Sequence, residues 1–413
     1  MSETSEIPQS PPEGGIATEK PVPTAAEQKK QEPEEKDPFK LEIEGAGDEI
    51  RELLKRENFI AHDNDDLIRQ LEDPNRRFAT LVGFRREEGR ELPVKRFFKG
   101  PLPQQDPERD EKTRLAFQRQ TLAHYYLDMH TEVPLAEIFE FNADPSKGPM
   151  YAVMATYEEG SGIGFLRGYE DIGKLTPKHA RLAVRAIRGL AHQENGITPE
   201  LAEVLDKRPA YQDFEGFEGN MTAILDKPVI GAGKPHSEDK RPLHKILEER
   251  TRIGGFREKA LSLVACLKTT IEEGQKGIHL VHGDLAPNNL FLGDGIKAEE
   301  LMFLDFEWAG ISGNQILAEA YDFGNLRARS WTNEEFRDSL DKEMIESYAS
   351  EGREDIGRAI VTLGILRSHM NLAGFFENYP PEKSEQQIQI ERREATEKDI
   401  AKAWEVLGLN PKA

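Results

Sequence analysis

Four polar residues stand at the ends of two apolar stretches, with a spacing that suits phosphoryl transfer. His282, Asp284 and Asn289 lie in IHLVHGDLAPNNLFL, and Asp305 ends the apolar run of LMFLDFEW. A hydroxyl that attacks a γ-phosphate needs a carboxylate to orient it and accept its proton, and the phosphates need divalent cations that neutralise developing charge. An Asp, an Asn further along the same loop and a second Asp from a neighbouring strand supply these groups. The pattern therefore predicts a kinase site.

The chain between the two Asp residues predicts a short hairpin that carries the site, with Gly293 and Gly295 at its turn. The competing interpretation is a strand and a turn in which Asp284 and Asp305 have no joint role. The order and spacing of the two motifs favour the kinase interpretation. A lone histidine is more often structural than a proton shuttle, so we expect His282 to be a structural residue.

The segments HGDLAPNNLFL and FLDFEWAG resemble the aminoglycoside phosphotransferase and choline kinase group, which are small-molecule kinases with a protein-kinase-like fold. The resemblance implies that Asp284 is the catalytic base, and that Asn289 and Asp305 bind Mg²⁺. It also implies that His282 braces the catalytic loop, as does Asp322 of YDFGNL. The implied phosphate donor is ATP, and the implied acceptor is a hydroxyl of a small molecule. Glycine stands where protein kinases carry the Arg of this motif, which indicates a site assembled without a phosphorylated loop.

A kinase also needs an upstream lysine that holds the α- and β-phosphates. Residues 78–84 predict one strand and residues 92–98 predict the next, with a polar turn between them. Lys95 on the second strand is the predicted nucleotide-binding lysine. The alternative is a solvated strand residue beside Arg96 and Lys99.

The nucleotide-binding lobe departs from the wider kinase pattern in two ways. No GxGxxG motif precedes the lysine, so residues 72–77 are expected to form a shorter turn over the phosphates. The acid that pairs with the lysine normally comes from the next helix, predicted over residues 113–129. That helix carries Gln120, and Glu111 just before it is the alternative partner. A lysine held only by a neutral hydrogen bond would indicate low activity.

Residues 150–160 predict a strand that runs into an acidic turn and resembles the hinge between the two lobes of a kinase. The adenine of ATP is expected to meet backbone groups from Ala155 to Tyr157. A core strand followed by a turn describes the same residues, and the two interpretations are compatible.

Together these elements predict an α+β, protein-kinase-like fold with a small β-rich lobe and a larger, mainly helical lobe. Residues 41–154 are the predicted nucleotide-binding lobe, and residues 155–413 are the predicted catalytic and acceptor-binding lobe. Residues 1–40 are acidic, rich in Pro and poor in aromatic residues, which predicts a disordered tail because little apolar surface offsets the ordering entropy. Further helices are predicted over residues 44–57, 175–192, 332–349, 355–379 and 385–407.

Charge and composition argue against several classes of partner. The net charge of −21 disfavours nucleic acid and anionic membranes, which need a basic footprint, and is compatible with a cationic substrate. No apolar run is long enough to span a bilayer. The single cysteine, Cys266, excludes an intramolecular disulfide and favours a reducing compartment such as the cytoplasm.

The acceptor is not specified by these motifs. Sugars, amino alcohols, aminoglycosides and sugar amines share the same phosphate machinery, and all stay open. Residues 211–218 interleave aromatic and acidic side chains, which predicts either a cation-binding patch or a surface loop or helix-turn. Two rival functions also stay open: a nucleotide-binding pseudokinase that acts as a scaffold, and a protein kinase, which the absence of Ala-Pro-Glu after Asp305 disfavours.

Overall fold

The computed structural model describes thirteen stretches of the chain, all within one compact unit, Ile43–Ala413. The predicted tail, Tyr157, Gly293 and Gly295 lie outside the described residues. The described stretches are residues 47–61, 68–70, 72–73, 76–86, 89, 92–155, 164–165, 175–192, 197–207, 211–229, 240–292, 301–378 and 386–412.

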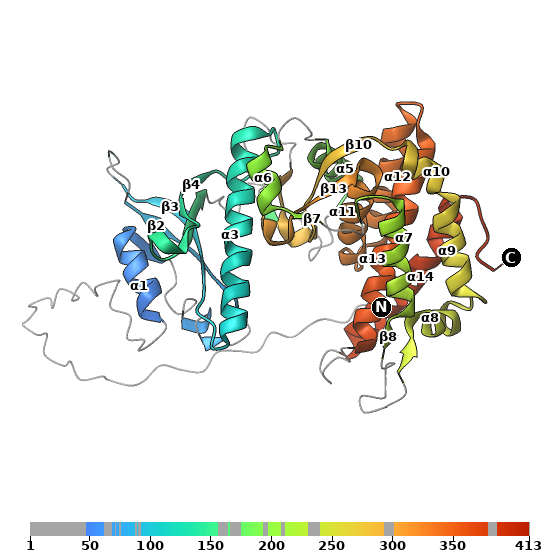
Figure 1. The fold of residues 1–413 in the computed structure, drawn as a ribbon, viewed down its shortest axis with the longest axis horizontal. Coiled ribbons are helices and arrows are strands. Elements are labelled where there is room, and N and C mark those ends of the chain that lie inside the picture. The colour runs from blue at the N-terminus through green and yellow to red at the C-terminus, as the bar shows by residue number, and fades with distance from the viewer. Residues whose placement is uncertain are drawn as a thin grey trace, which may run out of the picture. The chain divides into compact units, whose positions relative to one another are not determined.

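The N-terminal part of this unit is built on an antiparallel sheet of five strands in the order β1-β2-β3-β5-β4 (Figure 1). The two predicted strands are present as β2 and β3, which pair without a break from Phe78↔Pro101 to Arg85↔Val94. Successive side chains of a strand point to opposite faces, so Lys95 and Lys99 share one face of β3. The strands are β1 (Phe59–Ala61), β2 (Phe78–Arg85), β3 (Val94–Pro101), β4 (Ile138–Asn142) and β5 (Tyr151–Ala155).

Helix α3 (Pro107–His130) contacts both the sheet and the C-terminal part of the unit (Figure 1). It begins earlier than predicted because the Asp106 side chain caps it by accepting from the Glu108 N–H, with proline at the first helical position. The fully buried Phe117 ring packs against Phe78 of β2 with ring centroids 6.1 Å apart. This packing holds Gln120, one turn further along α3, over the sheet.

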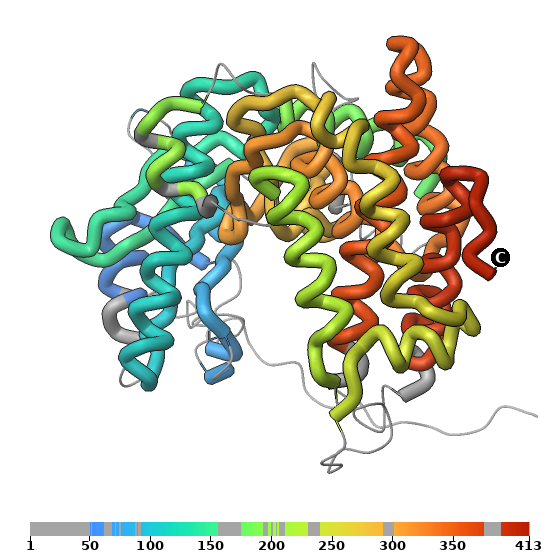
Figure 2. The backbone as a smooth tube through the Cα atoms, turned by 45° about the vertical axis from the view of Figure 1, so that its right-hand side comes forward, coloured from blue at the N-terminus to red at the C-terminus, as the bar shows by residue number. Residues whose placement is uncertain are grey.

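The C-terminal part is mainly helical, and Figure 2 shows its long helices running alongside one another. The predicted hairpin is present: β11 (Leu290–Leu292) pairs antiparallel with β12 (Leu301–Phe303). The other predicted helices are also present, with ends shifted by no more than three residues. The described helices of four or more residues outside α3 are α1 (Gly47–Arg56), α5 (Pro177–Ala191), α6 (Pro199–Val204), α7 (Phe214–Asp226), α8 (Leu243–Thr251), α9 (Phe256–Cys266), α10 (Lys268–Glu273), α11 (Gln315–Arg329), α12 (Glu334–Ala349), α13 (Glu354–Asn378) and α14 (Gln386–Val406).

Helices α11 and α13 approach closely at two glycines. A Cβ on Gly324 would lie 2.3 Å from the Gly364 carbonyl oxygen, so no larger residue fits without a shift of the helices. The close crossing brings Asn325 of α11 within hydrogen-bond distance of Arg367 of α13, with Nη1 donating to Oδ1 at 3.0 Å. The glycine pair therefore fixes the relative position of polar residues on the two helices.

An antiparallel sheet followed by a mainly helical part confirms the predicted α+β, protein-kinase-like fold class. None of the helices that the structure describes is both long enough and apolar enough to cross a bilayer.

Three buried histidines give the fold a predicted sensitivity to acid. Burial lowers the pKa of His124 and of His282 to about 4, and that of His369 to about 3, from 6.5. Unfolded histidines bind protons below pH 6.5 while the folded ones do not, so the free energy of unfolding falls as the pH drops from 6.5 towards 4. We expect a slope of up to about 4 kcal/mol per pH unit from the three together.

Urea unfolding at steps between pH 7 and pH 5 measures this slope. His369→Gln keeps an acceptor for the Arg327 guanidinium, which donates to His369 Nε2 at 3.0 Å. That variant is expected to flatten the slope by roughly a third, because one of three titrating groups is gone. Stability that does not change over this pH range would contradict the prediction.

Candidate functional site

A cavity of about 730 Å³ lies between the sheet, α3 and two short stretches, residues 288–291 and 304–306. Its size is within the usual range for small-molecule and cofactor sites. Apolar residues of three strands, Val82, Phe97 and Met154, line one side, and the polar side includes Lys99, Asn289 and Asp305. An apolar wall facing a cluster of charged and amide groups suits a purine joined to phosphates.

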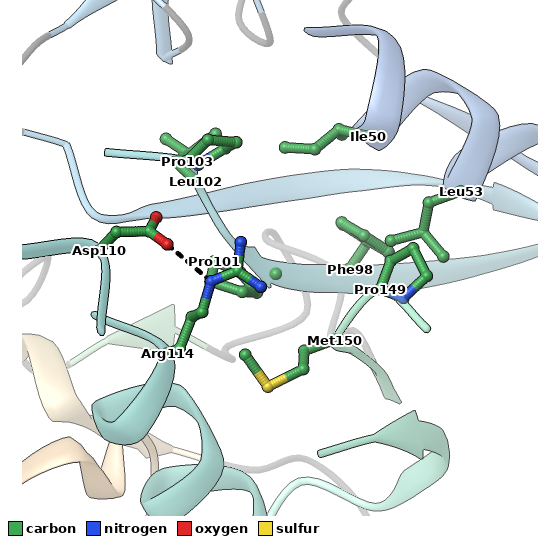
Figure 3. A pocket seen from close by; sticks show the side chains of 11 residues that line it. Ile50, Leu53, Phe98, Pro101, Leu102, Pro103, Asp110, Arg114, Pro149 and Met150 are labelled. Atoms are coloured by element: carbon green, nitrogen blue, oxygen red, sulfur yellow. Dashed lines mark hydrogen bonds and ion pairs between the residues drawn. The ribbon is translucent and has the colours of Figure 1, made fainter. Parts of the chain in front are cut away.

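A second, much smaller cavity lies beside α1 and β3 (Figure 3). Ile50, Leu53 and Met150 line it, and the ion pair of Arg114 with Asp110, at 2.7 Å, lies at one side. Its volume of about 20 Å³ holds one water molecule and no metabolite. It is a packing defect of the core and no candidate for a substrate site.

The lysine that contacts Asp305 is Lys99. Its Nζ lies 2.9 Å from Gln120 Oε1 and 3.1 Å from Asp305 Oδ1, and the residue is only 8% exposed. Lys95, the lysine predicted from the sequence, lies on the same face of β3 and also lines the cavity. Its ammonium makes no ion pair with any residue that the structure describes. The contacts thus single out Lys99, which sequence reasoning passed over.

The partner of this lysine on α3 is an amide. Gln120 is 6% exposed and accepts a hydrogen bond from Lys99, whereas Glu111, the alternative acid, is exposed. The negative charge near Lys99 comes instead from Asp305. Within the described residues, the ion pair of this lysine therefore joins β3 to Asp305, two residues after the end of β12, and not to α3.

His282 links the two predicted motifs. Its Nε2 donates to the Leu304 carbonyl at 2.7 Å, and its Nδ1 lies 3.4 Å from the Asp284 backbone N–H. The ring also packs against Phe306, with centroids 4.9 Å apart. Because burial lowers the pKa of His282 to about 4, the ring is neutral near pH 7. Its contacts are those of a residue that holds the two segments together.

Asp322 of α11 holds the same loop through two hydrogen bonds to its backbone. Its carboxylate accepts the backbone N–H groups of His282 at 2.7 Å and of Gly283 at 3.0 Å. Gly283 has φ +84°, and a Cβ there would lie 1.9 Å from the Trp308 carbonyl oxygen. This close approach explains why the motif carries glycine between His282 and Asp284, since an Arg would collide with the backbone after Asp305.

Asn289 and Asp305 both line the large cavity. The Asn289 Nδ2 donates to the Asp284 carbonyl at 2.8 Å, which leaves Oδ1 as the free oxygen of the amide. Asp305 has φ 63° and ψ 67°, a left-handed conformation that costs free energy in residues other than glycine and that recurs at functional sites. Within the described residues no group of three or more His, Cys, Asp or Glu could hold a metal alone. An amide and a carboxylate oxygen fit Mg²⁺, which completes its shell with water and phosphate.

Asp284 lines a different cavity, of about 360 Å³. Its carboxylate pairs with the Arg329 guanidinium. Asp284 and Asp305 therefore line separate cavities, and Asn289 connects them because its side chain lines one and bonds to the backbone of Asp284 in the other. Such an arrangement suits a phosphate donor in the cavity that Asp305 lines and a hydroxyl acceptor in the cavity that Asp284 lines.

The prediction that backbone groups from Ala155 to Tyr157 meet the adenine can be examined at Ala155. Ala155 lines the large cavity, but its N–H already donates to the Glu137 carbonyl at 2.8 Å. Any backbone donor for a purine must therefore come from elsewhere, and Tyr157 lies outside the described residues. Asn288, which the register of the motif leaves without a role, is exposed and lines the cavity.

Residues 211–218 form core and a helix start rather than a surface patch. Tyr211, Phe214 and Phe217 are buried, and Asp213 caps α7 by accepting the Gly216 N–H at 2.8 Å. The Tyr211 ring does face a cation, the Arg367 guanidinium of this chain, at 5.4 Å. The interpretation of this stretch as a cradle for a substrate cation is therefore wrong.

Comparison with known proteins finds likeness at the level of structure only. No protein-family model matches the sequence, and no curated protein matches it. The structural neighbours include an ethanolamine kinase of Plasmodium vivax, at 14% identity over 87% of this chain and 96% of that one, with a TM-score of 0.44. A microcompartment-associated aminopropanol kinase has 14% identity over 80% and 90%, with a TM-score of 0.45. The GDP complex of an aminoglycoside 2′-phosphotransferase has 13% identity over 78% and 92%, with a TM-score of 0.43. Likeness of this degree leaves the activity to the geometry of the site.

Proposed function

We propose that this chain is a phosphotransferase that moves the γ-phosphate of ATP to a hydroxyl of a small molecule. The observation that carries the proposal is the contact of Lys99 with Asp305 in a nucleotide-sized cavity, which Asn289 also lines while Asp284 lines the neighbouring one. A lysine, two oxygen ligands for a cation and a carboxylate for the acceptor are the groups that this reaction needs.

Each residue then has a defined task. Asp284 orients the acceptor hydroxyl and takes its proton as the oxygen attacks phosphorus. Lys99 donates to phosphate oxygens of the nucleotide, and Asn289 and Asp305 would hold Mg²⁺. Bound magnesium would supply charge neutralisation at the β- and γ-phosphates. His282 and Asp322 keep the loop in place through the hydrogen bonds to Leu304 and to the loop backbone.

The rival function is a pseudokinase that binds nucleotide without turnover. Gln120 favours it, because an amide leaves the lysine without the helix-borne carboxylate of active kinases. Asp305 argues against it, because this carboxylate already orients the Lys99 ammonium. The cavity beside Asp284, about 360 Å³ in volume, suits a small acceptor better than a protein segment.

Release of ADP or GDP in the presence of a library of hydroxyl compounds tests the proposal. ATP and GTP are both offered because the described residues do not select the purine, and magnesium is present or chelated. We expect magnesium-dependent turnover with at least one acceptor. Nucleotide binding without turnover on any acceptor would favour the pseudokinase instead.

Asp305→Ala is expected to weaken magnesium-dependent nucleotide binding at least about tenfold, because it removes a direct ligand of the cation. Calorimetric titration with nucleotide, with and without Mg²⁺, measures the effect. Asp355→Ala is the matched control, since Asp355 is an exposed carboxylate in the first turn of α13. Equal magnesium dependence in Asp305→Ala and in the unmodified chain would contradict the assigned role.

A further inference from the structure

The cavity that Asp284 lines has more positively than negatively charged side chains among its described lining residues. Two arginines, Arg329 of α11 and Arg367 of α13, line it together with Tyr321, Asn325 and Asn371. Asp284 is its one acidic lining residue among those that the structure describes, and it pairs with Arg329. The cavity is therefore basic inside a chain of net charge −21.

Arg367 is held in place by neutral groups. Its Nη1 donates to Asn325 Oδ1 at 3.0 Å, and its guanidinium carbon lies 4.0 Å from the centre of the Tyr321 ring and 5.4 Å from that of Tyr211. No carboxylate of the described part of the chain pairs with it, and its Nε is buried without a hydrogen-bond partner there. A partly buried cation without a counter-charge is costly, and a fixed guanidinium is already organised for a planar anion.

A cationic acceptor would meet unfavourable charges in this cavity. It would lie near two guanidinium groups, and Asp284, the one carboxylate among the described lining residues, is the group that must receive the hydroxyl. A carboxylate or phosphate of an acceptor, in contrast, matches the fork of Arg367. It would also draw the Arg329 guanidinium away from Asp284 and free that carboxylate for the hydroxyl.

We propose that the acceptor is an anionic hydroxyl compound, whose carboxylate or phosphate binds Arg367 and Arg329 while its hydroxyl faces Asp284. This inference rests on the proposed phosphotransferase function and names its substrate class. It reverses the expectation from net charge, because the charge of the cavity and not that of the whole chain acts on a bound acceptor.

Matched sets of acceptors that share one carbon chain and differ in the charge of one end group test the substrate class. Gluconate, sorbitol and glucamine form one set, and glycerate, glycerol and 3-amino-1,2-propanediol form another. With ATP and Mg²⁺ we expect kcat/KM for the anionic member to exceed that for the neutral member by about 10- to 100-fold, the usual gain from a charge-assisted hydrogen bond. The amine should be the poorest member of each set.

Arg367→Gln tests the assigned residue. It should raise the KM for the anionic acceptor by about 10- to 100-fold, with kcat and the KM for nucleotide changed little, because the residue binds the acceptor away from the reacting atoms. Arg367→Lys should keep part of the affinity. Arg353→Gln removes the same charge from an exposed position just before α13 and should change nothing.

The outcomes separate the inference from the proposed function. Turnover on neutral or amine acceptors, with Arg367→Gln unchanged, would overturn the anionic acceptor and leave the phosphotransferase standing. If no acceptor turns over, calorimetric titration of gluconate and glycerate into the full chain decides. Binding that Arg367→Gln abolishes supports the anion site, and absence of binding overturns it.

Discussion

Replacement of Asp284 by asparagine is expected to lower turnover by about 10²- to 10⁴-fold, the usual contribution of a general base. Asparagine has nearly the shape of aspartate but accepts no proton from the attacking hydroxyl. The loop should keep its conformation, because the backbone N–H groups of His282 and Gly283 bond to Asp322, and the side chain of Asn289 bonds to the backbone carbonyl at position 284. The loss should therefore appear in kcat, while nucleotide affinity is retained.

Steady-state rates of the purified variant on the best acceptor measure this effect. Asp355→Asn makes the same chemical change at an exposed position and should leave the rate unchanged. The thermal unfolding midpoint of Asp284→Asn shows whether the variant is folded. A folded variant with nearly normal kcat would remove Asp284 from the role of base.

The local features of the site followed from the sequence. An apolar stretch that ends in an acid predicts a strand followed by an exposed carboxylate, and this pattern located the hairpin of β11 and β12 with Asp305 just after it. The long C-terminal helices were predicted for the same reason, because apolar periodicity over many residues is a strong signal. Hydrogen bonds across the loop, such as that of His282 to Leu304, complete an arrangement that the spacing alone had indicated.

The sequence could not predict which side chains from distant parts of the chain lie close together in the site. The predicted strand ended at residue 98, but β3 continues to Pro101 and so includes Lys99. The sequence does not tell which lysine of one strand face lies opposite Asp305. The basic cavity was missed for a related reason, because Arg329 and Arg367 meet only through the close crossing of α11 and α13 at Gly324 and Gly364. Net charge averages over the whole surface and hides such a local excess.

The second large effect separates the two lysines of β3. Lys99→Met is expected to lower kcat by about 10²- to 10³-fold, as loss of one preorganised donor to developing negative charge usually does. Lys95→Met should change kcat only a few-fold, because the Lys95 ammonium contacts none of the described acidic residues while Lys99 lies 3.1 Å from Asp305. The two variants remove the same charge from the same face of one strand, so each is the control for the other.

Comparison of kcat for the two variants shows which lysine acts on the phosphates: Lys95, which was predicted from the sequence, or Lys99, which contacts Asp305 in the structure. Methionine keeps the length and apolar stem of lysine, so β3 should pack as before, and the thermal unfolding midpoints of both variants check this. Lys99 also donates to Gln120, and Gln120→Glu should lower neither kcat nor nucleotide affinity if the lysine alone acts on the phosphates. A large loss of kcat in Lys95→Met, with normal kcat in Lys99→Met, would instead assign the phosphate contact to Lys95, near the start of β3. It would also make the contact of Lys99 with Asp305 a structural ion pair.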